Sequence, residues 1–415
     1  MTADPVRAVP PTEARPARAA PEALRAHAAA LATLPGLGLR HLAALVLDPG
    51  PVEAWARVVA GRPLPAPPGR ARRPPDPGGS WAAVARRLDV GAHWAGLGRR
   101  GIDVVVLGAA GYPPALAEDP EPPGVLFWRG DLGALDAPLV AVVGTRRASG
   151  YGRRVAHELG LDLAAAGVGV VSGLALGVDG AAHRGALAGR GAAPVGVVGS
   201  GLDVVYPRTH AELWSTVAAH GLLASEAPPD AAPEPWRFPV RNRILAALAG
   251  AVVVVESPAA GGSVHTVEAA LARDRPVMAV PGPVTSACSA LPNQLLAEGA
   301  APARDATDVL VALGLAGSAG PRPPPAPPPA DPADPAAAAV LDALGWDRAG
   351  LEELVVATGL PAPSVAVALA DLERTGWVAA GGGWWERAGP PTPAARGGSG
   401  SPTAPPGARR VRWGG

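Results

Sequence analysis

Short valine-rich runs alternate with stretches of helical periodicity through the centre of the chain. The runs lie at 102–107, 139–143, 168–171, 195–198, 251–255 and 276–280, and the stretches between them have helical spacing. Continuously apolar strands separated by helices are typical of a parallel sheet covered on both faces. The pattern predicts an α/β domain over 100–315 with a Rossmann-like, doubly wound, mostly parallel sheet.

The chain before this domain has a different pattern. Residues 1–20 are rich in proline and alanine, and we expect them to be disordered. Residues 21–60 have helical periodicity, with a Gly-x-Gly turn in "LPGLGLRHLAAL" (34–45). The turn has two interpretations. It could belong to a helix-hairpin-helix, whose amide groups can bind a DNA phosphate, or it could be a plain turn in a small helical bundle. A proline-rich linker is predicted at 61–80.

The chain after the domain begins with a second proline-rich linker at 316–336. Residues 337–387 then predict three short helices and a hairpin with a glycine turn, the pattern of a winged helix. A flexible tail is expected at 388–415, where proline and glycine are again frequent.

Charge and composition narrow the functional classes. The 36 basic and 36 acidic residues give a formal net charge of zero, so any anion site has to be local. Every basic residue is an arginine, which argues against a P-loop NTPase because that loop needs a lysine. The single cysteine, Cys288, allows no internal disulfide. With no apolar signal core and no run long enough to span a bilayer, we expect a cytoplasmic protein without a membrane partner.

The first strand-end loop, "AVVGTRRASGYG" (141–152), gathers positive charge without any acid. Gly144 ends the strand, and Arg146 and Arg147 precede a predicted helix whose amide groups already favour an anion. Ser149 could cap the helix or bind a phosphate oxygen, and Tyr151 could stack or donate its hydroxyl. A solvated arginine pair is the alternative, but cations at a helix N-terminus oppose its dipole.

The second loop, "VSGLALGVDGAAHRGAL" (171–187), predicts a close backbone approach to a ligand at Ser172 and Gly173. Asp179 and His183 lie four residues apart on the next helix. A metal site would need further ligands at suitable spacing, so we expect internal hydrogen bonds and no metal.

Two further loops follow strands and contain glycine pairs. Gly199 and Gly201 precede Arg208 in "VGSGLDVVYPRTHAEL" (198–213), but the dinucleotide fingerprint is incomplete. Gly262 and Ser263 precede a predicted helix in "VESPAAGGSVHTVEAAL" (255–271), a phosphate-cradling pattern that suits a nucleotide as well as a polynucleotide.

A fifth segment, "PWRFPVRNRILAALAG" (235–250), combines cations with an aromatic residue. Arg237, Arg241 and Arg243 could hold phosphates, Phe238 could stack on a base and Asn242 could contact a base edge. Alternatively, Phe238 is an ordinary core residue. We predict a surface for single-stranded nucleic acid here.

The strand-end motifs together resemble the DprA/Smf family of DNA-processing proteins. "GTRRASGYG", "SGLALGVDGAAHRGAL", "GSGLDVVYP", "FPVRNRILAAL", "VVVVESPAAGGSVHT" and "VPGPV" follow one another in the family's order between about 100 and 310. The resemblance implies a SAM-like N-terminal domain and a C-terminal winged helix. It also implies that the protein binds single-stranded DNA without strong sequence preference, forms homodimers and helps to load RecA in natural transformation. The family is not known to turn over a substrate, and the resemblance implies no cofactor.

Individual site residues are carried over from the family's motifs. By resemblance, Arg146 and Ser149 contact phosphate, Arg241 and Arg243 match the "FPxRNR" arginines, and Phe238 contacts a base. Gly262 and Ser263 match the phosphate-cradling turn. After "VPGPV" the chain has Ala-Leu-Pro where the family commonly has a glycine.

Two other functional classes share part of this sequence pattern. A nucleoside-monophosphate phosphoribohydrolase of the lysine-decarboxylase-like family would use "GGSVHTVE" with Glu268, but Val264 stands where that motif needs glycine and Thr266 is displaced by one position. A transcription factor would read DNA with "PSVAVALADLERTG" (363–376), whose net negative charge opposes entry into a phosphate-lined groove.

Overall fold

The computed structural model describes residues 20–66, 76, 79–315, 334–345, 348–381 and 383–387. The expectations for 1–19, for most of the linkers and for the tail therefore lie outside the described residues. The chain divides into two compact units, Met1–Arg322 with Trp346–Arg348, and Pro323–Gly345 with Ala349–Gly415. Each unit is described by itself.

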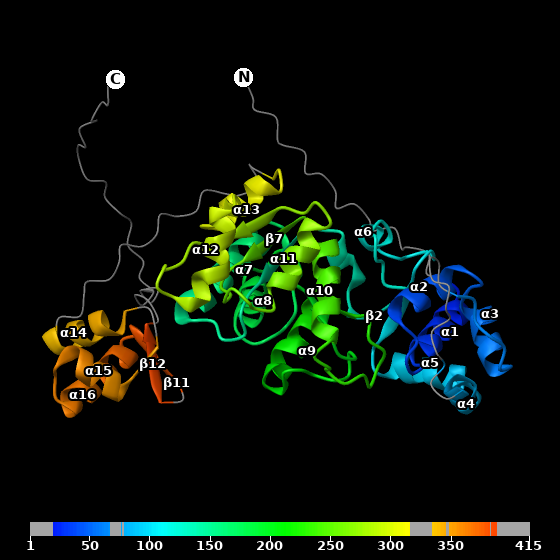
Figure 1. The fold of residues 1–415 in the computed structure, drawn as a ribbon, viewed down its shortest axis with the longest axis horizontal. Helices are drawn as coiled ribbons and strands as arrows, with labels where there is room; N and C mark the ends of the chain where they lie inside the picture. The colour runs from blue at the N-terminus through cyan, green and yellow to red at the C-terminus, as the bar shows by residue number, and fades with distance from the viewer. Residues whose placement is uncertain are drawn as a thin grey trace, which may run out of the picture. The chain divides into compact units, whose positions relative to one another are not determined.

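A nine-stranded sheet of order β1-β2-β6-β5-β4-β3-β7-β8-β9 forms the centre of the first unit (Figure 1). The strands are β1 (Asp103–Val106), β2 (Val125–Gly130), β3 (Leu139–Val143), β4 (Gly169–Ser172), β5 (Val195–Val198), β6 (Leu222–Ser225), β7 (Ala251–Val254), β8 (Val277–Ala279) and β9 (Ala301–Pro302). From β6 to β9 all neighbouring strands are parallel. The predicted mostly parallel, doubly wound fold is confirmed.

The sheet's first two strands depart from the parallel pattern. β2 pairs antiparallel with both β1 and β6, so the predicted run at 102–107 is not a strand of the parallel set. β2, β6 and β9 lie outside the six predicted runs. The prediction failed here because it required valine-rich runs, whereas β2 reads "VLFWRG" and β6 reads "LLAS".

Helices cover both faces of the sheet, because alternate residues of each strand point to opposite sides. Val140 and Val142 belong to one buried cluster with α7, α8 and α13. Ala141 and Val143 belong to the other, with α9, α10, α11 and α12. These helices are α7 (Gly150–Ala165), α8 (Val178–Ala188), α9 (Ala211–His220), α10 (Arg237–Leu248), α11 (Val264–Leu271), α12 (Ala290–Ala297) and α13 (Ala306–Ala312).

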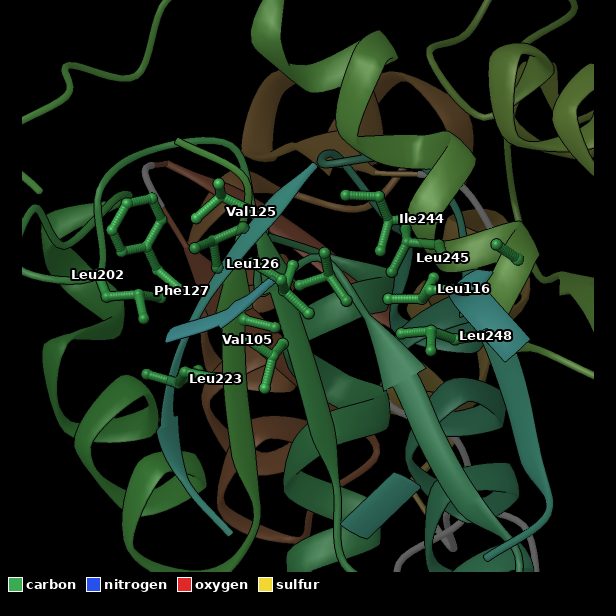
Figure 2. Packing of buried hydrophobic residues seen from close by; sticks show 14 of the residues in the cluster. Val105, Leu116, Val125, Leu126, Phe127, Leu202, Leu223, Ile244, Leu245 and Leu248 are labelled. Atoms are coloured by element: carbon green, nitrogen blue, oxygen red, sulfur yellow. The ribbon is translucent and has the colours of Figure 1, made fainter. Parts of the chain in front are cut away.

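Five N-terminal helices share a core with the sheet. They are α1 (Glu22–Ala32), α2 (Leu39–Leu47), α3 (Pro51–Val59), α4 (Ser80–Arg87) and α5 (Val90–Arg99). α1 packs on β1 and β2, and α2 packs on β2. Figure 2 shows part of the cluster that they join, including Phe127 of β2, Leu116 of α6 (Pro114–Ala117) and Ile244 of α10. The helical layer is therefore continuous with the core of the sheet.

The second unit is a winged helix, as predicted. Helices α14 (Pro335–Leu344), α15 (Leu351–Thr358) and α16 (Ala362–Arg374) precede a hairpin of β11 (Val378–Gly381) and β12 (Trp384–Arg387), and β10 (Ala349–Gly350) pairs with β12. Leu341, Leu354, Leu369 and Trp377 are in its buried core.

Among the described ranges, no single helix is long and apolar enough to cross a membrane. α15 and α16 reach the required length and composition only as a pair, which is bent by 110°.

Candidate nucleic-acid interface

The carboxyl ends of β3, β4, β5 and β7 lie at one edge of the sheet, and the predicted loops follow them. The chain continues from β3 to β4 on one side, and later returns to β7 on the other side of β3. In open α/β sheets, ligands bind outside the carboxyl ends at such a reversal of strand order. The fold therefore gathers at one edge loops that are far apart in the sequence.

The first loop is closed by a buried carboxylate. Ser149 is the N-cap of α7, and its hydroxyl accepts from Gly152 N at 3.1 Å. The same hydroxyl donates to Glu256 Oε1 at 2.6 Å, while Ser149 N donates to Glu256 Oε2 at 2.8 Å. Glu256 follows β7 and is only 2% exposed. The Ser149 hydroxyl, for which we predicted either a helix cap or a phosphate contact, thus caps α7 and is held by an acid of the same chain.

An arginine and two aromatic rings meet beside this loop. The Arg146 guanidinium lies 4.8 Å from the centre of the Phe238 ring, and the Tyr206 ring lies 5.6 Å from that of Phe238. Arg146 is exposed, Phe238 is half-buried and Tyr206 is 39% exposed. A guanidinium at this distance from a ring centre forms a cation–π pair. Two strand-end loops and the first turn of α10 thus supply one small cationic and aromatic surface.

Arg241 lies beneath the second loop and contacts the end of β5. Its buried guanidinium donates to the Val197 carbonyl and to Asn242 Oδ1. A Cβ added at Gly173 would lie 2.3 Å from Arg241 Nη2, so only glycine allows this close approach. Burial lowers the pKa of Arg241 to about 10, which the nearby Asp179 carboxylate opposes. Arg241 therefore stays charged at neutral pH while lying beneath the surface.

Asp179 and His183 are buried members of the same region. Asp179 lies in the first turn of α8 and accepts from Gly173 N at 3.1 Å, and burial raises its pKa against the opposing charge of Arg241. Burial lowers the pKa of His183 to about 4, so the imidazole is neutral at pH 7. Among the described residues no cluster of three metal-ligating side chains occurs.

Arg243 lies in a buried ion pair. Its Nη2 donates to both carboxylate oxygens of Glu226 at 2.7 and 2.6 Å, and the two side chains are 13% and 7% exposed. Burial raises the pKa of Glu226, and Arg243 opposes that rise. The acid follows β6 and lies outside the segment in which we expected free arginines.

The remaining arginines and hydroxyls of the predicted site divide between surface and interior. Arg147 and Arg208 are exposed, and the Arg147 carbonyl accepts from Cys288 Sγ at 3.8 Å. Ser172 is fully buried and donates to the Val142 carbonyl. Tyr151 donates its hydroxyl to the Pro281 carbonyl. Tyr151 and Ser172 therefore stabilise the strand ends and loops through hydrogen bonds within the chain.

The predicted glycines and Ser263 lie close to these groups or at open surface. A Cβ on Gly199 would lie 3.3 Å from the Phe238 ring, one on Gly144 would contact Val178 and the Glu256 carbonyl, and one on Gly201 would lie 2.7 Å from the Pro228 carbonyl. Gly262 faces open space. Ser263 is buried at the start of α11 without a capping side-chain bond.

Sequence reasoning missed Tyr206 and Glu256. Tyr206 precedes Pro207 directly after a strand-end loop, so an aromatic residue in that place was the available signal. Glu256 is separated from Ser149 by 107 residues, and only the return of the chain to β7 reveals their contact.

Comparisons with known proteins match both units. The family profile described as DNA recombination-mediator protein A covers residues 103–314, and that of the DprA winged helix domain covers 324–383. Protein Smf of Escherichia coli (strain K12) is 37% identical over 280 residues, which are 66% of this chain and 75% of that protein. A putative DNA processing protein DprA of Mycobacterium tuberculosis (strain H37Rv) is 40% identical over 260 residues, 62% of this chain and 67% of its own length.

A solved structure shows a similar fold. The X-ray structure of DNA processing protein A from Streptococcus pneumoniae has a TM-score of 0.58 at 29% identity, and the match covers 70% of this chain and 97% of that one.

Proposed function

We propose, from the premise that this chain belongs to the DNA recombination-mediator protein A family, that it binds single-stranded DNA and acts as a recombination mediator. The observation that carries the proposal is the Arg146 guanidinium over the Phe238 ring, with Tyr206 beside it. These groups provide both a cation for the backbone and flat surfaces for bases.

The proposed binding mode divides the work between cations and rings. Arg146, Arg147 and Arg208 are exposed and would neutralise successive phosphates. Tyr206 and Phe238 would stack on bases, an interaction worth about 1–3 kcal/mol per base and tolerant of sequence. Because stacking needs unpaired bases, this surface favours single strands over duplex. Arg241, lying beneath, would hold the loops and add positive potential.

Ser149, Tyr151, Ser172 and Arg243 then have supporting roles. Each already has a partner within the chain. Gly262 and Ser263 stay a proposed secondary contact, since this glycine faces open space.

The proposed function needs partners besides DNA. By family resemblance we propose that the protein forms a homodimer, works in the cytoplasm and helps RecA to assemble on single-stranded DNA. The measurement is RecA filament formation on strands coated with single-strand-binding protein, with and without this chain. Unchanged filament formation would leave a DNA-binding protein without a mediator role.

The proposal assigns the site to binding, with no chemical turnover. Glu268, the acid of the competing phosphoribohydrolase motif, is exposed and accepts from His265 when that ring is suitably protonated. We expect no free adenine from AMP in a chromatographic assay; release at a useful rate would support the enzyme instead.

The direct test compares labelled single- and double-stranded oligonucleotides of one length over a salt series. Tighter binding of the single strand, weakened by salt and by Phe238→Ala, is the expected result. Equal affinity for both forms would contradict the stacking surface.

A further inference from the structure

A carboxylate of this chain occupies the helix end at which a Rossmann-type fold holds a nucleotide phosphate. In doubly wound folds that phosphate lies at the N-terminus of the first crossover helix, where strand order reverses. Here the reversal is between β3 and β7, and α7 is the corresponding helix. Glu256 follows β7 and accepts from both Ser149 N and Ser149 Oγ.

The space at this helix end is filled. A Cβ added at Gly152, in the first turn of α7, would lie 2.1 Å from Glu256 Oε2 and 2.4 Å from its carboxyl carbon. The carboxylate therefore rests directly on the helix backbone. The main chain of Glu256 is also engaged, since Thr145 N donates to its carbonyl at 2.6 Å. Glu256 thus holds both ends of the loop that carries Arg146.

We propose that Glu256 is a built-in substitute for a bound phosphate, which keeps mononucleotides out of the switch point and fixes the arginine loop for the phosphodiesters of a polynucleotide. A free nucleotide would have to place a second anion against this carboxylate and would find the Ser149 donors already used. The inference rests on the proposed function in assigning the loop to DNA, but exclusion of phosphate is testable without DNA.

The test removes the carboxylate and offers a soluble anion. Wild type, Glu256→Ala and Glu256→Asp are unfolded thermally in inorganic phosphate or AMP, with sodium chloride at matched ionic strength. We expect no phosphate-specific shift for wild type or Glu256→Asp. For Glu256→Ala we expect the melting temperature to rise by about 3 °C when phosphate exceeds its dissociation constant about tenfold.

The matched control is Glu268→Ala, which removes an exposed carboxylate from α11. It lowers negative charge equally without opening the α7 end, so no phosphate-specific shift is expected. If Glu256→Ala is unfolded in chloride, recovery of its fold in phosphate is the same readout.

Three results would overturn the inference. The first is no response of Glu256→Ala to phosphate or AMP, folded or unfolded, and the second is equal phosphate binding by wild type and this variant. A phosphate response of Glu256→Asp equal to that of Glu256→Ala would also overturn it. Single-strand binding by wild type is measured in parallel. Its failure alone would refute the proposed function and leave the phosphate result standing.

Discussion

Replacing Arg146 with alanine removes the cation that lies 4.8 Å from the Phe238 ring. A hydrogen bond to a charged group contributes about 1.5–3 kcal/mol, and because Arg146 is exposed we take the lower end. Single-strand affinity should therefore fall about tenfold at low salt. Losing one phosphate contact also reduces the salt slope by about 0.7. Between 50 and 200 mM salt, the deficit relative to wild type should shrink about 2.6-fold.

The assay is fluorescence anisotropy with labelled oligothymidylate over that salt range. Arg146→Lys keeps the charge, so the wild-type slope should be retained while loss of the planar stack weakens binding by about two- to fivefold. Arg190→Ala serves as control, because Arg190 is exposed in the turn between α8 and β5, at the opposite edge of the sheet. An unchanged slope for Arg146→Ala, or an equal loss for Arg190→Ala, would refute the reasoning.

Three further predictions address stacking, the buried ion pair and pH. Phe238→Ala should weaken oligothymidylate binding by about 5- to 150-fold at an unchanged salt slope; a changed slope in the anisotropy titration would contradict a stacking role. Arg243→Ala leaves Glu226 buried and unpaired, so it should lower the free energy of unfolding in urea by about 3–5 kcal/mol. Replacing Glu226 as well should restore part of this loss. Wild-type stability of the single variant would contradict the prediction. Because the folded pKa of His183, about 4, lies below the ordinary histidine value of about 6.5, the unfolded chain takes up the proton first as pH falls. The contribution of His183 to the free energy of unfolding, about 3 kcal/mol, is complete above pH 6.5 and is lost as the pH falls towards 4. The free energy of unfolding of His183→Gln, measured in urea, should therefore depend less steeply on pH than that of wild type. An equal pH dependence would contradict the assignment.

Local hydrophobic pattern predicted the parallel part of the fold well. β3, β5, β7 and β8 coincide with valine-rich runs, because strands buried on both faces have no polar alternation to obscure them. β6 was missed because four residues directly after a helix give little signal. The antiparallel pairing of β2 depends on contacts with strands on both sides, which no local pattern contains.

The sequence indicates the positively charged residues of the candidate site but not the acidic residues that pair with some of its polar groups. Arg146 is predicted from its loop and Phe238 from the segment that forms the start of α10, and both lie at the same edge of the sheet. The absence of acids within each loop suggested free arginines and hydroxyls. Glu226 and Glu256, however, reach Arg243 and Ser149 from other strand ends. Partners supplied by the fold decide which polar groups still face solvent.

The common core of α1, α2, β1 and β2 bears on how this protein can be dissected genetically. A deletion ending near residue 100 would remove α1 and α2, which pack on β2, and would uncover part of a core cluster in which Leu126 and Phe127 are fully buried. A functional defect of such a truncation would then reflect destabilisation of the whole unit and would not reveal the specific role of the helices. Surface substitutions on the outer side of α3, for example at the exposed Val52 and Glu53, are the cleaner probe of what the helical layer contributes.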